Sequence, residues 1–256
     1  MVSLFDLLPS EITHTEIIPK LDAISLLIFR HTFFAEDLPN GFNENLTKNI
    51  VENGSSLTML LWEKLDKTNI CRIAAFNGNL DLLKYARSKG CQWDKYTCAH
   101  AALGGNLDIL QFLHENLCPW DKLTCAFAAR NGFLECLIYA RENGCPWNFT
   151  TCYFAARGGS LECLKYAHKN KCPWDAMTCA SSAKSGSLEC LKYLHENECP
   201  WDQWTCYYAA LGGSLPCLKY AHDNGCPWDK DTYINAVKSG SAECVEYALK
   251  NGCPCN

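Results

Sequence analysis

The sequence predicts an all-α protein, an α-solenoid of stacked helix–turn–helix repeats with a small helical segment at the N-terminus. The first observation is a period of 27 residues that is kept over seven units. The second is that three residue types hold fixed places in this period: a tryptophan, a cysteine two residues before it, and a glycine. The tryptophans are Trp93, Trp120, Trp147, Trp174, Trp201 and Trp228. A constant period is typical of units that bury their apolar faces only by stacking.

Each unit is expected to begin with a short helix, and residues 97–121 serve as the example. Cys98, Ala101 and Ala102 have i, i+3, i+4 spacing, which is one face of a helix. Gly104 and Gly105 follow and are expected to end the helix, because glycine readily adopts the left-handed conformation. Alanine recurs at the equivalent positions of other units. We therefore expect the first helices to approach one another closely.

A second helix is expected over about residues 107–116. Asn106 precedes it, and five other units have Asn or Ser at the equivalent position, which favours an N-cap; Phe133 is the exception. An acidic residue follows two positions later in six of seven units, where the helix dipole favours negative charge. The predicted core stripe consists of Leu107, Leu110 and Leu113.

A loop rich in punctuating residues joins each unit to the next, as in residues 143–152, NGCPWNFTTC. Pro146 prevents the preceding helix from continuing, and Asn148 or Thr151 can cap the next one. Trp147 supplies a large apolar surface that is repeated in every unit. We therefore expect the tryptophans to close the seam between neighbouring helix pairs.

Composition disfavours several classes of partner. The 256 residues carry a net charge of −5 and no basic run, so we expect no nucleic-acid binding. No apolar window approaches the roughly 18 residues of a membrane-spanning helix. Residues 1–20 lack the basic start and cleavage site of a signal peptide. We expect a cytoplasmic protein without a membrane partner, and we expect a monomer.

The nineteen cysteines are interpreted as small buried apolar residues. Equivalent cysteines of adjacent units should be separated by about 8–10 Å, the usual distance between packed helices. That distance exceeds the roughly 4.4–6.8 Å between the Cα atoms of a disulfide. No paired C-x-x-C occurs, so we expect no metal site and no cofactor.

A histidine recurs in the last turn of the predicted second helix, with arginine in its place in two units. We interpret this position as a cation that complements the helix C-terminus. A catalytic Cys–His pair would need one special position, whereas here every candidate pair is repeated along the chain. We therefore expect no enzyme activity. The recurring residues are His114, His168, His195 and His222, with Arg87 and Arg141.

One side of the first helix changes from unit to unit, unlike the packing positions. Its residues lie at i, i+4 and i+7, opposite the Cys and Ala face, and we expect them on the concave surface of the solenoid. Aromatic and arginine side chains dominate this set, which is the composition of interface hot spots. The predicted partner-binding residues are Tyr96, His100, Phe127, Arg130, Phe154, Arg157, Trp204 and Tyr208. The alternative is that some of these rings only cover neighbouring loops. The same side includes Met177, Ser181 and Lys184.

The unit T-C-x-x-A-A-x-x-G-x-L-E-C-L-K-Y-A-x-x-N-G-C-P-W-D resembles an ankyrin repeat over residues 66–256. The resemblance implies a helix, a glycine turn, a second helix and a glycine stop, with a role in binding proteins. The unit has 27 residues in place of about 33. A compact loop around the tryptophan is therefore expected in place of the protruding β-turn finger. Similar short Cys-Pro-Trp units are abundant in large DNA viruses of protists, which implies a viral or protist origin and, if viral, the host cytoplasm.

Residues 1–40 do not follow the period, and they resemble an F-box. The resemblance implies that five residues would dock a Skp1-type adaptor: Leu8, Pro9, Ile12, Ile17 and Leu21. Pro19 inside a presumed helix departs from that pattern. The alternative is a set of capping helices that shields the first repeat. Residues 41–65 are interpreted as a linker and a degenerate repeat.

Two functions are compatible with these patterns. One is a non-catalytic scaffold that binds a partner protein, not identified by the sequence, on the concave face of its repeats. The other is a substrate receptor that recruits targets to a Skp1-containing ubiquitin ligase.

Overall fold

A computed structural model describes residues 67–255 of the chain. The segment 1–40, the linker 41–65 and the F-box-like residues named above lie outside the described residues. Within residues 67–255 the regular structure consists of helices alone, which confirms the all-α prediction. The loops between successive pairs, such as residues 116–121, contain neither helix nor strand, as expected of a compact loop.

First and second helices alternate along the chain. The first helices are α5 (Lys67–Phe76), α7 (Lys95–Gly104), α9 (Lys122–Arg130), α11 (Phe149–Arg157), α13 (Ala176–Lys184), α15 (Gln203–Leu211) and α17 (Lys230–Ser239). The second helices are α6 (Leu80–Ser88), α8 (Leu107–Glu115), α10 (Leu134–Glu142), α12 (Leu161–Lys169), α14 (Leu188–Glu196), α16 (Leu215–Asp223) and α18 (Ala242–Lys250).

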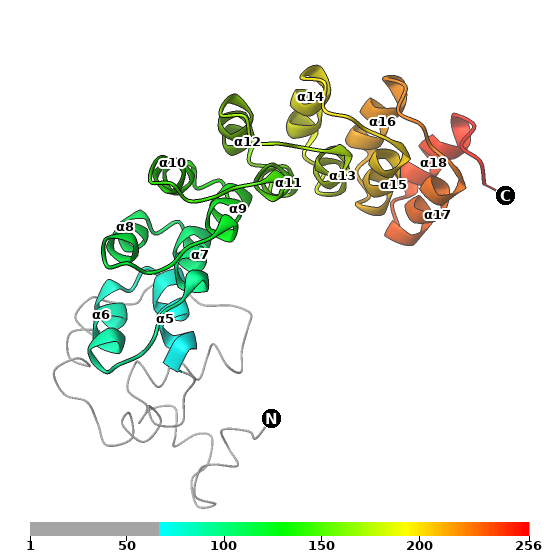
Figure 1. The fold of residues 1–256 in the computed structure, drawn as a ribbon. Coiled ribbons are helices and arrows are strands. Elements are labelled where there is room, and N and C mark those ends of the chain that lie inside the picture. Colours follow the sequence, from blue (N-terminus) through cyan, green and yellow to red (C-terminus); the bar gives the residue numbers. More distant parts are fainter. Residues whose placement is uncertain (1–66, 256) are drawn as a thin grey trace, which may run out of the picture. The chain divides into compact units, whose positions relative to one another are not determined.

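The described residues belong to two compact units. One contains residues 67–71 and 80–92, where α6 buries Leu82, Leu83 and Ala86. The other contains residues 72–79 and 93–255. In this second unit, α7, α9, α11, α13, α15 and α17 pack side by side in one row, and each also packs against its own second helix (Figure 1). The predicted stacking of two-helix repeats is therefore confirmed.

The last residue of each loop caps the first helix that follows it; for α11 the sequence had offered Asn148 or Thr151. The Asn148 side chain accepts a hydrogen bond from the backbone N–H of Thr150, and Asp121 accepts one from Leu123. Asp94 also forms a capping box with Thr97. Thr151 lies inside α11 and is buried, so Asn148 is the cap.

The residue at the end of each first helix alternates between glycine and a small polar residue along the chain. This residue determines how closely the turn after the helix approaches the equivalent turn of the preceding repeat. A Cβ on Gly158 would lie 1.6 Å from the carbonyl oxygen of Arg130. One repeat earlier, Asn131 donates from its side-chain amide to the carbonyl of Leu103 at 2.9 Å. Ser185, one repeat later, donates to the carbonyl of Ala156 at 3.3 Å. These three turns therefore contact the turn of the preceding repeat, either directly or through a hydrogen bond.

The predicted N-cap role of the residue before the second helix is wrong in three units. Asn106, Ser160 and Ser187 form no side-chain hydrogen bond at the start of their own helices. Asn106 donates instead to the carbonyls of Ala75 and Phe76, both at 2.8 Å. Ser214 and Ser241 do cap their helices as predicted.

The core stripe of α8 is shifted from the predicted one. Leu110 and Leu113 are fully buried, as predicted, whereas Leu107 is half-buried. Ile109 is buried in its place. The helix ends at Glu115, one residue before the predicted end.

The tryptophans close the seam between consecutive helix pairs, as predicted. Trp120 stacks on His114 of its own repeat with 4.1 Å between ring centroids, and it meets the edge of Tyr139 of the next repeat at 6.4 Å. His114 Nδ1 is hydrogen-bonded to the Tyr139 hydroxyl at 2.9 Å. The same triad recurs at Trp174, Trp201 and Trp228.

The side chains at the histidine position stack on the loop tryptophans, and Arg87 at this position also donates to the carbonyl of Cys91 beyond its helix at 3.0 Å, as predicted for a cation at a helix C-terminus. Burial lowers the pKa of His168, which favours the neutral ring. Where arginine replaces histidine, the Arg141 guanidinium lies over the Trp147 ring at 4.4 Å from its centroid. Imidazole and guanidinium share a flat shape that stacks on an indole ring. A flat group that stacks on the tryptophan is therefore common to the histidine repeats and to the repeat of Arg141.

The cysteines pack in the core, as predicted, and all are buried except Cys255. The loop cysteine also closes its helix pair: Cys145 Sγ donates to the carbonyl of Asp121 at 3.3 Å, and Cys172 to that of Asn148 at 3.2 Å. Burial raises the pKa of the Cys136 thiol to about 11 and that of Cys163 to about 12. These cysteines are therefore neutral thiols at physiological pH.

Candidate partner-binding face

The residues predicted to bind a partner lie on the row of first helices. We define the variable face as positions 2, 6 and 9 after the loop in the four helices α9, α11, α13 and α15. These positions are Leu123, Phe127, Arg130, Thr150, Phe154, Arg157, Met177, Ser181, Lys184, Trp204, Tyr208 and Leu211. Arg130, Arg157 and Trp204 are exposed, whereas Phe127, Phe154 and Tyr208 are half-buried.

The rings of α9 and α11 contact one another. Phe127 meets Phe154 edge to face, with 6.0 Å between ring centroids. The guanidinium of Arg130 lies 6.0 Å from the centroid of Phe154. These half-buried rings therefore contribute to packing between repeats as well as to the surface.

A second aromatic cluster lies on α15. Trp204 contacts Tyr208 at 6.2 Å between ring centroids, and Trp204 remains 42% exposed. The ammonium group of Lys184, on α13, lies 5.3 Å from the centroid of Tyr208. This cluster leaves a large indole surface available to a partner.

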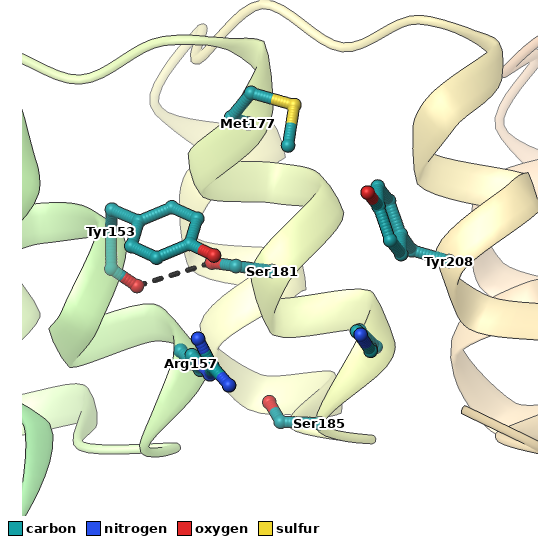
Figure 2. Close-up of a pocket in the computed structure, with 7 residues that line it drawn as sticks. Tyr153, Arg157, Met177, Ser181, Ser185 and Tyr208 are labelled. Atoms are coloured by element: carbon teal, nitrogen blue, oxygen red, sulfur yellow. Dashed lines mark hydrogen bonds between the residues drawn. The ribbon is translucent and has the colours of Figure 1, made fainter. Parts of the chain in front are cut away.

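A pocket separates the two clusters, and Figure 2 shows the residues that line it. It follows α13 from Met177 to Ser185, with Tyr153 and Arg157 of α11 on one side and Tyr208 of α15 on the other. Its volume is about 260 Å³, and Ser181 and Lys184 complete the lining. Three of the seven lining residues lie on α13, and Ser185 follows its last residue.

The pocket exists because Ser181 is small. The equivalent residues of the flanking first helices are Phe154 and Tyr208. Ser181 is buried and its hydroxyl donates to the carbonyl of Tyr153 at 3.1 Å (Figure 2). Because the first helices on both sides have a ring at this position, the smaller serine leaves a space of about one ring unfilled.

The variable face is positively charged in a chain that is acidic overall. Arg130, Arg157 and Lys184 each occupy the last residue of a first helix. Among the described residues, neither Arg157 nor Lys184 takes part in an ion pair. No carboxylate occupies the twelve positions of the face. The face therefore favours a partner that carries negative charge.

Two of the predicted residues lie apart from this pocket, on α7. Tyr96 is 37% exposed, and the Arg72 guanidinium lies 4.9 Å from its ring centroid. Arg72 also forms an ion pair with Asp94. His100 Nδ1 is hydrogen-bonded to the Tyr96 carbonyl at 2.7 Å. Both residues are thus held by local contacts.

Sequence reasoning placed Arg157 and Tyr208 at the site, and the structure brings both to the pocket. It included Met177, Ser181 and Lys184 on the variable side without marking a pocket there. It missed Tyr153 and Ser185, which lie outside the i, i+4, i+7 set. The sign that could have located the pocket is the serine between Phe154 and Tyr208, at a position that is also aromatic in α9.

Residues 67–255 lack the features of two other kinds of site. No cluster of three or more His, Cys, Asp or Glu side chains in this range could hold a metal ion. No helix in this range is long and apolar enough to cross a membrane.

Comparison with solved structures identifies the type of fold. The structure is similar to the crystal structure of the human ASB11 ankyrin repeat domain, with a TM-score of 0.50 and 18% sequence identity. The match covers 61% of this chain and 84% of that one. No protein-family model and no curated protein matches the chain. The chain therefore folds as an ankyrin-like α-solenoid with a short, finger-free repeat.

Proposed function

We propose that this protein is a non-catalytic scaffold that binds a partner protein through the variable face of its first helices. The observation that carries the proposal is the pocket between α11, α13 and α15, flanked by two aromatic clusters. Tyrosine, tryptophan and arginine are the residues that contribute most to protein–protein affinity. On the variable face, Arg157, Trp204 and Tyr208 are residues of these three types at positions that differ from one repeat to the next.

The remaining surfaces of the repeat support this assignment by contrast. The loops repeat the same tryptophan contacts in successive units, which is what stacking requires. Burial raises the pKa of the Cys136 and Cys163 thiols, so these two cysteines lack the thiolate that nucleophilic catalysis needs. The variable face is the part of the described repeats that distinguishes one unit from another.

A charge-reversal pair tests the proposal. Arg157→Glu changes the variable face, and Lys219→Glu makes the same charge change at an exposed residue of α16. Proximity labelling in the native host cell, with each variant and the unchanged protein, would identify partners. The proposal requires at least one partner that Arg157→Glu loses and Lys219→Glu keeps. Identical partner sets for the two variants would refute it.

The second candidate function is an F-box-type substrate receptor, favoured by the resemblance of residues 1–40 to that motif. In this function, Leu8, Pro9, Ile12, Ile17 and Leu21 bind a Skp1-type adaptor while the repeats hold the target. Binding of purified Skp1, compared between the unchanged protein and a Leu8→Ala/Ile12→Ala variant, tests it. No binding, or equal binding by both proteins, would leave the N-terminal segment as a cap.

A further inference from the structure

We propose that the pocket between α11, α13 and α15 binds an acidic side chain of an extended partner peptide, with an apolar residue of the same peptide against Met177. This inference rests on the proposed function and specifies the chemistry of the partner. Its occupant is a segment of a protein that carries Asp or Glu about three residues from an apolar residue.

Two cationic side chains at one end of the pocket determine where the acidic side chain of the peptide would bind. Arg157 ends α11 and Lys184 ends α13, and both line the pocket. Among the described residues, no hydrogen bond uses the Arg157 guanidinium or the Tyr208 hydroxyl, whereas Ser181 and Ser185 already donate to backbone carbonyls. A carboxylate accepts hydrogen bonds from such free donors, and a charge-assisted bond to arginine is among the stronger ones in proteins.

The carboxylates nearest along these helices lie at the opposite end. Asp175 and Asp202 precede α13 and α15, where they accept hydrogen bonds from the first turns of those helices. The pocket thus has a cationic end at Lys184 and an apolar end at Met177, which is 39% exposed. An acidic group is favoured at the first end and disfavoured at the second.

The distance between the two ends gives the spacing of the peptide. Met177 and Lys184 are seven residues apart on one helix, which corresponds to about 10 Å at about 1.5 Å per residue. An extended peptide covers about 3.3 Å per residue. The acidic and apolar residues of the peptide should therefore be about three positions apart.

A peptide fits this site better than a nucleic acid does. Tight binding to a phosphate backbone involves many cations, about six to ten contacts in typical complexes. The variable face offers three, Arg130, Arg157 and Lys184, in a chain of net charge −5. The pocket is also lined by two tyrosines and a methionine, which suit an apolar side chain.

The test begins with selection of random twelve-residue peptides displayed on phage against the full chain. Enriched peptides should share Asp or Glu about three positions from Leu, Met, Phe or Trp. Their affinities are then measured by fluorescence anisotropy with synthetic labelled peptides. Arg157→Glu and Lys184→Glu should each weaken binding about tenfold or more, because each removes a charged hydrogen-bond donor and adds repulsion.

Two further variants control the interpretation. Lys238→Glu reverses a charge near the end of α17, outside the pocket, and should leave affinity unchanged. Ser181→Phe introduces the residue found at the equivalent place in α9 and α11, so it should fill the pocket and abolish binding. Thermal melting of each variant verifies that it folds; if Ser181→Phe does not, the two charge reversals decide.

The outcomes separate this inference from the proposed function. Selected peptides that lack an acidic residue, but lose affinity with Trp204→Ala, would overturn the inference and retain the face. Peptides insensitive to every face substitution, or no selected peptide at all, would overturn both. Binding of a fluorescent single-stranded oligonucleotide, weakened by Arg157→Glu in place of peptide binding, would also overturn the inference.

Discussion

The seam and the variable face both contain aromatic side chains, but these side chains have different roles in the two regions. In the seam, His114, Trp120 and Tyr139 form a contact set that recurs with nearly the same geometry along the stack. On the variable face, the contact between Phe127 and Phe154 is not continued, because the next equivalent residue is Ser181. Repetition of a contact indicates that it stabilises the stack, and its interruption indicates where a partner can bind.

The largest effect is expected where consecutive turns touch. Gly158→Ala places a Cβ 1.6 Å from the Arg130 carbonyl oxygen, and overpacking against backbone should lower the free energy of unfolding by about 3 kcal/mol. Urea denaturation measures this free energy of unfolding. Ser185→Ala, at the equivalent place one repeat later, removes only a hydrogen bond and should cost about 1 kcal/mol. If Gly158→Ala were as stable as the unchanged protein, Gly158 would not lie close to the Arg130 carbonyl.

The next effect concerns the seam. Trp174→Ala removes the stack on His168 at 3.9 Å and the edge contact with Tyr193 at 6.5 Å. We expect a loss of about 2 kcal/mol, less than for a fully buried tryptophan because Trp174 is half-buried. Thermal melting followed by circular dichroism measures the loss. A variant as stable as the unchanged protein would contradict the structural role of the tryptophans.

A smaller stability effect is expected on the variable face. Phe154→Ala removes the edge contact with Phe127, so we expect a loss of about 1 kcal/mol, together with weaker binding of a selected peptide. Phe127→Ala should behave in the same way. Parallel melting and anisotropy measurements separate the two effects. A stability loss as large as that of Trp174→Ala would assign these rings to the core, as the alternative interpretation holds.

The smallest effect concerns pH. Burial lowers the pKa of His168 in the folded protein, so the unfolded chain binds its proton first as pH falls below about 6.5. The free energy of unfolding should therefore decrease through this range, with no contribution from His168 at higher pH. Comparison of His168→Gln with the unchanged protein by urea denaturation, at about pH 7.5 and about pH 5.5, isolates the contribution. A protein that gains stability on acidification relative to His168→Gln would contradict this sign.

The sequence was sufficient for features that lie within one unit. The 27-residue period and the left-handed glycines such as Gly105 follow from local chemistry, which also narrowed the cap of α11 to Asn148 or Thr151. The seam was also predictable, because a large apolar ring repeated in every loop has few other places to pack.

Features that join two units were harder to predict. Asn106 looks like an N-cap, but its partners are the carbonyls of Ala75 and Phe76, about thirty positions earlier in the sequence. In the sequence, distances were considered only between cysteines at equivalent positions of adjacent units. In the structure, Cys98 Sγ lies 3.8 Å from the carbonyl oxygen of Cys118, which occupies a different position of the repeat. The pocket depends on three consecutive helices, so no single unit reveals it.

The central claim is that the seam stabilises the stack and the variable face binds a partner. The most direct measurement determines both the free energy of unfolding and the affinity for one selected peptide in Trp174→Ala and Arg157→Glu. We expect Trp174→Ala to lose stability but keep its affinity while folded, and Arg157→Glu to keep nearly all its stability but bind about tenfold more weakly or worse. Equal losses of affinity in the two folded variants would contradict it.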